Sequence, residues 1–446
     1  MPDHATSSDP AVQAQLDRLT MLSPGRDVLG LERIAALMER LGNPHRSLPP
    51  VFHVAGTNGK GSTCAFLRAM LEAAGHKVHV YSSPHLVRFN ERIRVAGRLI
   101  EDAVLAPLLA EVLDCSEDIA PSFFEATTAA AFLAFARTPA DACVIEVGLG
   151  GRLDATNVIE IPLVCGIATI GIDHEAFLLD PSNGPNWPPL ERIAWEKAGI
   201  AKKGVPLVTM GNWYPAEVRR VIADAAKQAG AHLFDGWTAK SGGGDHHLVY
   251  GEGEGCYFHG PPPALPGRHQ VRNAGLAIAM LRRQSKLFVS EEHMKAGVAA
   301  ARWPGRLQKL GEGPLTALAP GREVWLDGGH NIDAGLAIAR FFGGVEADAA
   351  NPPRPLHLIT GMLANKDPAA IVAPLAAQLL SLSIVPAPGH ETHAPDAFAS
   401  YSNLPARSFP DVPAALAALP PEGDVLIAGS LYLAGEVLRL NAEYPD

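Results

Sequence analysis

A glycine-rich segment limits what this chain can fold into more than any other feature of the sequence. It reads Ala55-Gly56-Thr57-Asn58-Gly59-Lys60-Gly61-Ser62-Thr63 and directly follows the short apolar run Val51–Ala55. Apolar residues then recur with helical spacing over residues 62–73, and Val78–Tyr81 is a second short apolar run. A strand, a glycine turn, a helix and another strand form the βαβ unit of a parallel sheet, so this segment predicts an α/β fold.

The same segment has the composition of a phosphate-binding loop. Its glycines let successive backbone N–H groups point at phosphate oxygens, Lys60 adds a cation, and the following helix presents its positive end. It departs from a strict Walker A motif, because Val54 takes the first glycine position and Gly61 separates Lys60 from the hydroxyl residues. A tight turn without a ligand is the alternative. The flanking strand and helix favour nucleotide binding, with these candidate contacts: Thr57, Asn58, Gly59, Lys60, Gly61 and Ser62.

Strand-like runs and glycine or proline boundaries divide the chain into two predicted domains. The first, residues 1–301, has further expected strands at 143–147, 163–170 and 206–210, and a meander or surface excursion at 238–266. We expect residues 1–24, which are polar, to be loosely ordered. The pattern restarts around Arg302-Trp303-Pro304-Gly305, which opens a smaller Rossmann-like α/β domain at 302–446. In it, strands are expected at 323–326, 355–360, 383–385 and 424–428, and helices at 334–342, 369–380, 412–419 and 431–441.

Composition excludes several classes of protein. The 446 residues include 37 Lys and Arg against 47 Asp and Glu, a net charge of −10, which argues against a nucleic-acid or anionic-membrane binder. The long uncharged stretch at 368–389 contains four prolines and several polar residues, so we do not expect it to span a membrane. The N-terminus has no signal-peptide pattern, and the five scattered cysteines are typical of free thiols. We therefore expect a cytoplasmic enzyme.

Polar residues follow three predicted strands at the edge where a parallel sheet binds ligands. They are Ser83, Glu146 and His174. A carboxylate in a buried strand needs a partner, and Mg²⁺ prefers oxygen ligands, so Glu146 is either a magnesium ligand or half of a core salt bridge. Taken alone, His174 is more typical of a structural histidine. The later loop Arg152-Leu153-Asp154-Ala155-Thr156-Asn157 is either a substrate-orienting loop or a capped turn.

Together these motifs resemble the folylpolyglutamate synthase/dihydrofolate synthase family of the Mur ligase superfamily. The matching segments keep the family's order from about residue 29 to 440: the phosphate loop, Ser82-Ser83-Pro84-His85-Leu86, Phe123-Phe124-Glu125-Ala126-Thr127-Thr128, 146–157, Glu196-Lys197-Ala198-Gly199-Ile200, Asn273-Ala274, Pro304-Gly305-Arg306, Asp327-Gly328-Gly329-His330-Asn331, Gly361-Met362-Leu363 and Gly429-Ser430-Leu431-Tyr432. The resemblance implies an N-terminal P-loop ATPase domain, a C-terminal Rossmann-like domain and ATP-dependent amide-bond synthesis.

The resemblance also implies roles for individual residues. Ser83, Glu146 and His174 resemble the magnesium ligands, with two ions expected. Lys197 matches a lysine that is carbamylated in the family, and a plain Lys197 that pairs with Glu196 or a phosphate is the alternative. The remaining matches are nucleotide contacts at Asn273, Arg306 and Asp327, the pteroate pocket at Ser122, Phe123, Phe124, Glu125, Leu153, Asp154 and Ala155, and catalytic side chains at Lys60, Lys197 and His330.

The implied reaction joins L-glutamate to dihydropteroate and to reduced folates through an acyl phosphate. The partners are then small molecules, without nucleic acid or membrane, and we expect a monomer. The alternatives are an enzyme with one of these activities, another Mur-type ligase, or a P-loop ATPase without ligase chemistry. The sequence departs from the family at Gly329 and Ile332, in the long loop 180–189, and at 389–393, where relatives often carry an arginine.

Overall fold

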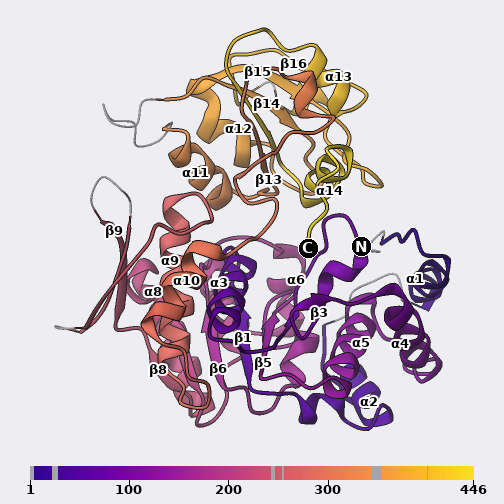
Figure 1. The fold of residues 1–446 in the computed structure, drawn as a ribbon, viewed down its shortest axis with the longest axis vertical. Helices are drawn as coiled ribbons and strands as arrows, with labels where there is room; N and C mark the ends of the chain where they lie inside the picture. Colours follow the sequence, from indigo (N-terminus) through magenta and orange to yellow (C-terminus); the bar gives the residue numbers. More distant parts are fainter. Residues whose placement is uncertain (1–4, 23–28, 243–246, 254–255, 344–352, 399) are drawn as a thin grey trace. The chain divides into compact units, whose positions relative to one another are not determined.

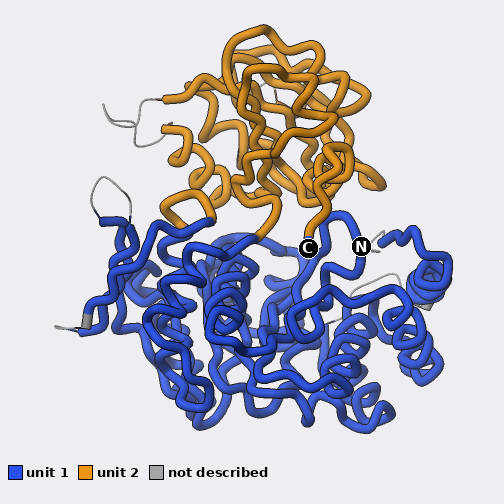
Figure 2. The backbone as a smooth tube through the Cα atoms, viewed as in Figure 1, with its two compact units in different colours: residues 1–264, 270–302, 446 blue, residues 265–269, 303–445 orange. Residues whose placement is uncertain are grey.

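The computed structural model describes residues 5–22, 29–242, 247–253, 256–343, 353–398 and 400–446. It divides into two compact units (Figures 1 and 2). Unit 1 comprises residues 1–264, 270–302 and 446, and unit 2 comprises 265–269 and 303–445. The functional assignment of the two predicted domains stays a prediction. Among the helices of the described residues, none combines the length and apolar character that crossing a bilayer requires.

Unit 1 is built on an eight-stranded sheet in the order β4-β3-β2-β5-β1-β6-β7-β8. Strands β2, β5, β1, β6, β7 and β8 run parallel, while β3 and β4 are antiparallel to their neighbours. The chain leaves the central β1 toward β2 on one side, and β6 pairs on the other side, which places a topological switch point at β1. The strands are β1 (Val51–Ala55), β2 (Val78–Tyr81), β3 (Ile93–Val95), β4 (Arg98–Leu99), β5 (Ala142–Glu146), β6 (Val164–Ile167), β7 (Pro206–Thr209) and β8 (His232–Phe234).

Helices cover this sheet and bury its apolar side chains. Helix α3 (Lys60–Ala73) packs so tightly on α10 (Glu291–Ala300) that a Cβ on Gly297 would lie 2.5 Å from the Met70 backbone. The other helices of unit 1 are α1 (Pro10–Leu22), α2 (Glu32–Arg40), α4 (Asp102–Asp114), α5 (Phe123–Arg137), α6 (Glu175–Leu178), α7 (Pro189–Ala198), α8 (Ala216–Ala229) and, from Gln270 onward, α9 (Arg268–Arg282).

Helix α1 corrects the expectation of loose order at residues 1–24 for Pro10–Leu22, whereas residues 1–4 and 23–24 lie outside the described residues. It places Val12, Leu16 and Leu19 in a core shared with α2, α4 and α5. These three residues recur at helical spacing, a signal hidden by the polar residues between them. The expected meander at 238–266 is a three-stranded antiparallel sheet of β9 (Trp237–Gly242), β10 (His247–Glu252) and β11 (Cys256–Gly260); Gly243, Gly244 and Gly255 lie outside the described residues.

Unit 2 is a smaller α/β layer with the strand order β12-β13-β17-β14-β15-β16. All neighbours are parallel except β12 and β13. The predicted helix 369–380 is wrong at its end, because α12 stops at Leu375 and the chain enters strand β15 at Leu379. The elements are β12 (Gln308–Lys309), β13 (Val324–Asp327), α11 (Ile332–Phe341), β14 (Leu356–Thr360), α12 (Ala369–Leu375), β15 (Leu379–Ile384), β16 (Ala406–Ser408), α13 (Val412–Ala417), β17 (Asp424–Ala428) and α14 (Leu431–Leu440).

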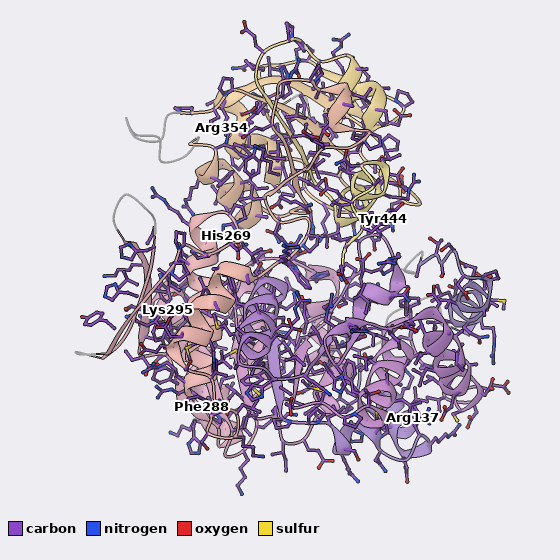
Figure 3. The ribbon with its side chains drawn as sticks, in the orientation of Figure 1. Arg137, His269, Phe288, Lys295, Arg354 and Tyr444 are labelled. Carbon is purple, nitrogen blue, oxygen red and sulfur yellow. The ribbon has the colours of Figure 1, made fainter. Side chains whose placement is uncertain are left out.

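Two basic side chains at the surface of unit 1 illustrate its exposed ion pairs. Arg137 at the end of α5 pairs with Glu111 at 2.6 Å, and Lys295 on α10 pairs with Glu292 at 2.7 Å (Figure 3). Such exposed pairs contribute little to stability, but they offset positive charge locally.

Candidate active site

The glycine-rich loop lies directly after β1 and leads into helix α3, so it connects a strand to a helix as the sequence predicts. The backbone N–H groups of Thr57 and Asn58 donate to the Thr169 carbonyl at 2.7 and 3.3 Å, which ties the loop to the segment after β6. Gly59 has φ +84°, and a Cβ there would lie 2.5 Å from Asn273 Oδ1. Both the backbone conformation and the close approach therefore require glycine. The contact also brings Asn273, a predicted nucleotide contact, onto the loop.

Two lysines converge on one carbonyl oxygen of this loop. Lys60 Nζ donates to the Gly56 oxygen at 3.1 Å, and Lys197 Nζ, from the end of α7, donates to the same oxygen at 3.0 Å. Lys197 is buried, and this burial, with the nearby charge of Lys60, lowers its pKa from 10.5 to about 7. The structure thus places a predicted phosphate ligand and the predicted modified lysine side by side.

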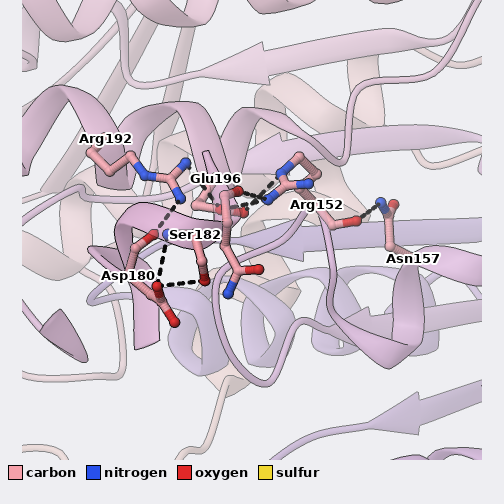
Figure 4. A network of polar contacts seen from close by, with 7 residues as sticks. Arg152, Asn157, Asp180, Ser182, Arg192 and Glu196 are labelled. Atoms are coloured by element: carbon pink, nitrogen blue, oxygen red, sulfur yellow. Dashed lines mark hydrogen bonds and ion pairs between the residues drawn. The ribbon is translucent and has the colours of Figure 1, made fainter. Parts of the chain in front are cut away.

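Glu196, the residue before Lys197, pairs with two arginines instead. Arg152 Nη2 approaches its carboxylate at 2.9 Å and Arg192 Nη1 at 3.3 Å, as Figure 4 shows. Adjacent residues of a helix point about 100° apart, which explains why Glu196 and Lys197 face different partners. The alternative in which Lys197 pairs with Glu196 is therefore absent from this structure.

The same arginines anchor the long loop 180–189. Arg152 Nη2 donates to the Asn183 carbonyl at 2.6 Å, and Arg192 Nη2 lies 3.5 Å from the Asp180 carbonyl (Figure 4). Both guanidinium groups also stack on the Trp195 ring, at 4.5 and 4.6 Å from its centre. Sequence reasoning missed this cluster. The i, i+4 spacing of Arg192 and Glu196 is visible in the sequence, but the third member, Arg152, is distant.

The predicted magnesium ligands lie at or after the carboxyl ends of three strands of the sheet, β2, β5 and β6. Glu146 is the last residue of β5 and is buried, and Ser83 follows β2, which pairs with β5. His174 follows β6 on the far side of β1; it is exposed and has φ +55°. Among the described residues, no three His, Cys, Asp or Glu side chains gather closely enough to hold a metal ion. The hydroxyl and carboxylate oxygens of Ser83 and Glu146 suit Mg²⁺, whereas the imidazole of His174 suits it poorly.

The predicted pteroate segments form two capped turns near this edge. Ser122 and Glu125 make a reciprocal capping box at the start of α5, and Arg33 pairs with Glu125 at 3.0 Å. Phe123 is buried, and the Phe124 ring covers Gly148, where a Cβ would lie 2.4 Å from it. Leu153, Asp154 and Ala155 lie at the start of a 3₁₀ turn, where Asp154 accepts the Thr156 N–H at 3.0 Å. The segment is a capped 3₁₀ turn, and its part in substrate binding stays a prediction.

In unit 2, Arg306, Asp327 and His330 lie close together at the end of β13. Asp327 accepts the N–H groups of Leu307 and Gly329 at 2.8 and 2.7 Å. Burial raises the pKa of this carboxyl, while the charges of Arg306 and His330 act in the opposite direction.

Sequence reasoning also missed Gln270, which orients Asn273. Asn273 Nδ2 donates to Gln270 Oε1 at 2.9 Å, and both side chains are buried on α9. The Asn273 carbonyl oxygen therefore faces Gly59. The i, i+3 spacing of two amides on a predicted helix is the signal that could have identified this pair.

Curated relatives match this chain over most of its length, although no family model matches it. The dihydrofolate synthase/folylpolyglutamate synthase of Bacillus subtilis is 40% identical over 318 residues, 68% of this chain and 69% of that protein. The Escherichia coli protein of the same name is 35% identical over 417 residues, 92% of this chain and 91% of that protein.

Solved structures of similar proteins have the same fold. Escherichia coli FolC in complex with DHPP and ADP is 32% identical, with a TM-score of 0.81 and 97% of each chain covered. The Yersinia pestis bifunctional folylpolyglutamate synthase/dihydrofolate synthase with AMPPNP and Mn has the same identity and TM-score, over 97% of this chain and 99% of that one. A bifunctional enzyme with Mn, AMPPNP and L-glutamate has a TM-score of 0.80, at 32% identity over 97% and 99% of the two chains. By sequence and by fold, this chain belongs to the dihydrofolate synthase/folylpolyglutamate synthase family.

Proposed function

We propose that this enzyme uses ATP to join L-glutamate to dihydropteroate and to reduced folates. Members of its family carry both activities in their names, and its solved relatives hold ADP, DHPP and L-glutamate. The observation that carries the proposal is the convergence of Lys60 and Lys197 on the Gly56 carbonyl, within a loop shaped by Gly59 at a sheet switch point. In this loop Lys60 supplies a cation, and the first turn of α3 supplies backbone N–H groups, a combination that suits phosphate.

The chemistry must turn a carboxylate into an acylating agent, because its oxygen is a poor leaving group. The acceptor's carboxylate oxygen attacks the γ-phosphorus of ATP, and ADP departs. The neutral α-amine of L-glutamate then attacks the acyl carbon of the resulting acyl phosphate. The nitrogen releases one proton, and inorganic phosphate departs with the oxygen that came from the acceptor's carboxylate. Both partners of the first step are anions, so Lys60 lowers the barrier by stabilising the charge on the transferring phosphoryl group. We propose Asn273, Arg306 and Asp327 as further nucleotide contacts and His330 as a catalytic side chain.

Ser83 and Glu146 are the residues that we propose to hold Mg²⁺. Their oxygens fit the ion, and they follow adjacent strands at the edge where the phosphate loop lies. A bound Mg²⁺ neutralises phosphate charge. His174 stays a proposed third ligand. Glu146→Gln is expected to raise the Mg²⁺ concentration needed for half-maximal turnover, and an unchanged requirement would remove Glu146 from the site.

Lys197 is the residue that we propose to be carbamylated. Its buried amine has a pKa of about 7, so a large fraction is neutral at physiological pH, and only the neutral amine adds to CO₂. The nitrogen lone pair bonds to carbon and one proton is released, which gives an anionic carbamate. When the protein is incubated with ¹³CO₂, we expect a ¹³C carbonyl resonance of the carbamate to appear. Lys197→Met should abolish this resonance.

The deciding experiment compares two acceptors. Purified enzyme receives Mg-ATP and L-glutamate with either dihydropteroate or a reduced folate monoglutamate, and phosphate release is measured. Turnover with both acceptors is expected. Turnover with one makes the enzyme monofunctional, and turnover with neither contradicts the proposal.

The remaining proposals concern the acceptor, the assembly and the compartment. Ser122, Phe123, Phe124 and Glu125, with Leu153, Asp154 and Ala155, are proposed to line the pteroate site. Because every proposed partner is a small molecule, we propose a monomer that acts in the cytoplasm, where ATP is supplied.

A further inference from the structure

A fully buried histidine stands in the middle of the strand that leads into the phosphate loop. His53 is the third residue of β1, between Ile145 of β5 and Cys165 of β6. Its Nε2 lies 2.8 Å from Thr156 Oγ1, and Thr156 Oγ1 lies 2.5 Å from Asp154 Oδ1. A chain of three buried polar side chains therefore runs from β1 to the loop that follows β5.

With Asp154 ionised, the hydrogen bonds give the direction of the protons in this chain. Asp154 accepts the Leu149 N–H on Oδ2 at 2.8 Å and the Thr156 N–H on Oδ1 at 3.0 Å. Burial raises the pKa of this carboxyl, whereas these hydrogen bonds and the nearby charge of Lys60 act in the opposite direction and favour the carboxylate. The Thr156 hydroxyl has one proton and donates it to Asp154. His53 must then donate from Nε2 to Thr156, which makes His53 a neutral imidazole with its proton on Nε2.

The surroundings hold His53 in this neutral form. Burial lowers its pKa to about 3, and the nearby charge of Lys202 acts in the same direction. Lys202 itself donates to the Asn157 carbonyl of the same loop at 3.0 Å. An imidazolium here would be a fully buried cation near the partly buried Lys202, at a large free-energy cost.

We propose that His53 is a positioning residue that acts through Thr156 and Asp154 to hold residues 149–157 in the shape that binds the acceptor substrate. This inference rests on the proposed function. It also changes how Asp154 works: its carboxylate is 3% exposed and its oxygens accept hydrogen bonds from the chain itself, so Asp154 shapes the pteroate loop from inside.

In this arrangement β1 supports two different binding loops. Its carboxyl end leads into the phosphate loop, while the side chain of His53 supports the acceptor loop. Loss of the His53 hydrogen bond should therefore disturb binding of the acceptor and spare binding of ATP. A purely structural histidine would lower thermal stability without separating the two KM values.

Thr156→Val carries the test, because it removes the hydroxyl at nearly constant volume. Since one buried hydrogen bond contributes about 1 kcal/mol, we expect the KM for dihydropteroate to rise about fivefold and the KM for ATP to stay within about twofold. Thr156→Ser keeps the hydroxyl and is the matched control. His53→Leu should reproduce the effect, and His53→Gln, whose amide N–H can replace Nε2–H, should restore the acceptor KM. Equal changes in both KM values, or none, would overturn the proposal.

An independent readout needs no turnover. In ¹⁵N NMR spectra of the free enzyme, His53 should show a protonated Nε2 and an unprotonated Nδ1, with no titration between pH 5 and 8. Thr156→Val should alter the Nε2 signal of His53. A protonated Nδ1 would refute the relay even if the enzyme is active, whereas the expected signals without turnover would refute only the proposed reaction.

Discussion

Replacing Lys197 by methionine should abolish turnover and yet stabilise the fold near neutral pH. Methionine is unbranched and about as long as lysine, so it fills the same buried space without an amine. The substitution removes the hydrogen bond from Nζ to the Gly56 carbonyl, although that carbonyl still accepts from Lys60 at 3.1 Å. Removing this hydrogen bond costs about 1 kcal/mol.

The substitution also removes a buried amine that opposes folding, and the stability gained in this way is larger than the cost of the lost hydrogen bond. A pKa that falls from 10.5 to about 7 corresponds to a penalty on the order of 5 kcal/mol at about 1.4 kcal/mol per pH unit. The unfolded chain keeps Lys197 protonated up to pH 10.5, whereas the folded chain releases the proton near pH 7. Between these values the unfolded state binds more protons, so the stability of the native enzyme rises with pH. The penalty is complete below pH 7 and vanishes near pH 10.5.

The assay is chemical denaturation at pH 7 and pH 9.5 in CO₂-free buffer, because a carbamate would replace the amine. At pH 7 the free energy of unfolding of Lys197→Met should exceed that of the native enzyme by about 4 kcal/mol, and above pH 7 this difference should shrink by about 1.4 kcal/mol per pH unit. Lys203→Met removes an exposed lysine and should show no such trend. A Lys197→Met protein that is less stable at pH 7, or an advantage independent of pH, would refute the reasoning.

Three further substitutions test separate contacts. Lys60→Ala should reduce turnover at least about 100-fold through lost phosphate stabilisation, with an unchanged circular dichroism spectrum; retained turnover would exclude Lys60 from the reaction. Gly59→Ala should destabilise the enzyme and raise the KM for ATP more than Gly204→Ala, since both glycines have positive φ but only Gly59 has a neighbour, Asn273 Oδ1, at 2.5 Å from the added Cβ. Equal effects in melting and kinetic assays would contradict this. Arg192→Leu should lower the free energy of unfolding by about 2 kcal/mol, measured by chemical denaturation, because it removes a buried partner of Glu196. An unchanged free energy of unfolding would show that this ion pair does not stabilise the fold.

The local fold could be predicted from sequence where periodicity and glycine boundaries agree. Val51–Ala55 and Val78–Tyr81 are strands at the predicted bounds, and the predicted helix between them is α3. The prediction failed where these signals conflict. Only Ala376, Ala377 and Gln378 separate helix α12 from strand β15, without a glycine or proline, so sequence alone could not place the change from helix to strand.

In the candidate site, contacts between residues close in sequence were predictable, whereas contacts between distant residues were not. The phosphate loop was predictable because its residues are contiguous and the physics of glycine and lysine is local. Lys197 meets Gly56 across 141 positions, and His53 meets Thr156 across 103. A histidine inside the apolar strand Val51–Ala55 signals a buried polar contact, but its partner depends on β1 and β5 being neighbours in the sheet.

The most direct test of the proposed ligase chemistry follows oxygen. Dihydropteroate labelled with ¹⁸O in its carboxylate is converted with Mg-ATP and L-glutamate, and the inorganic phosphate is analysed by mass spectrometry. If the carboxylate attacks the γ-phosphorus, one ¹⁸O per turnover appears in phosphate. Product formed with unlabelled phosphate would contradict the acyl phosphate route.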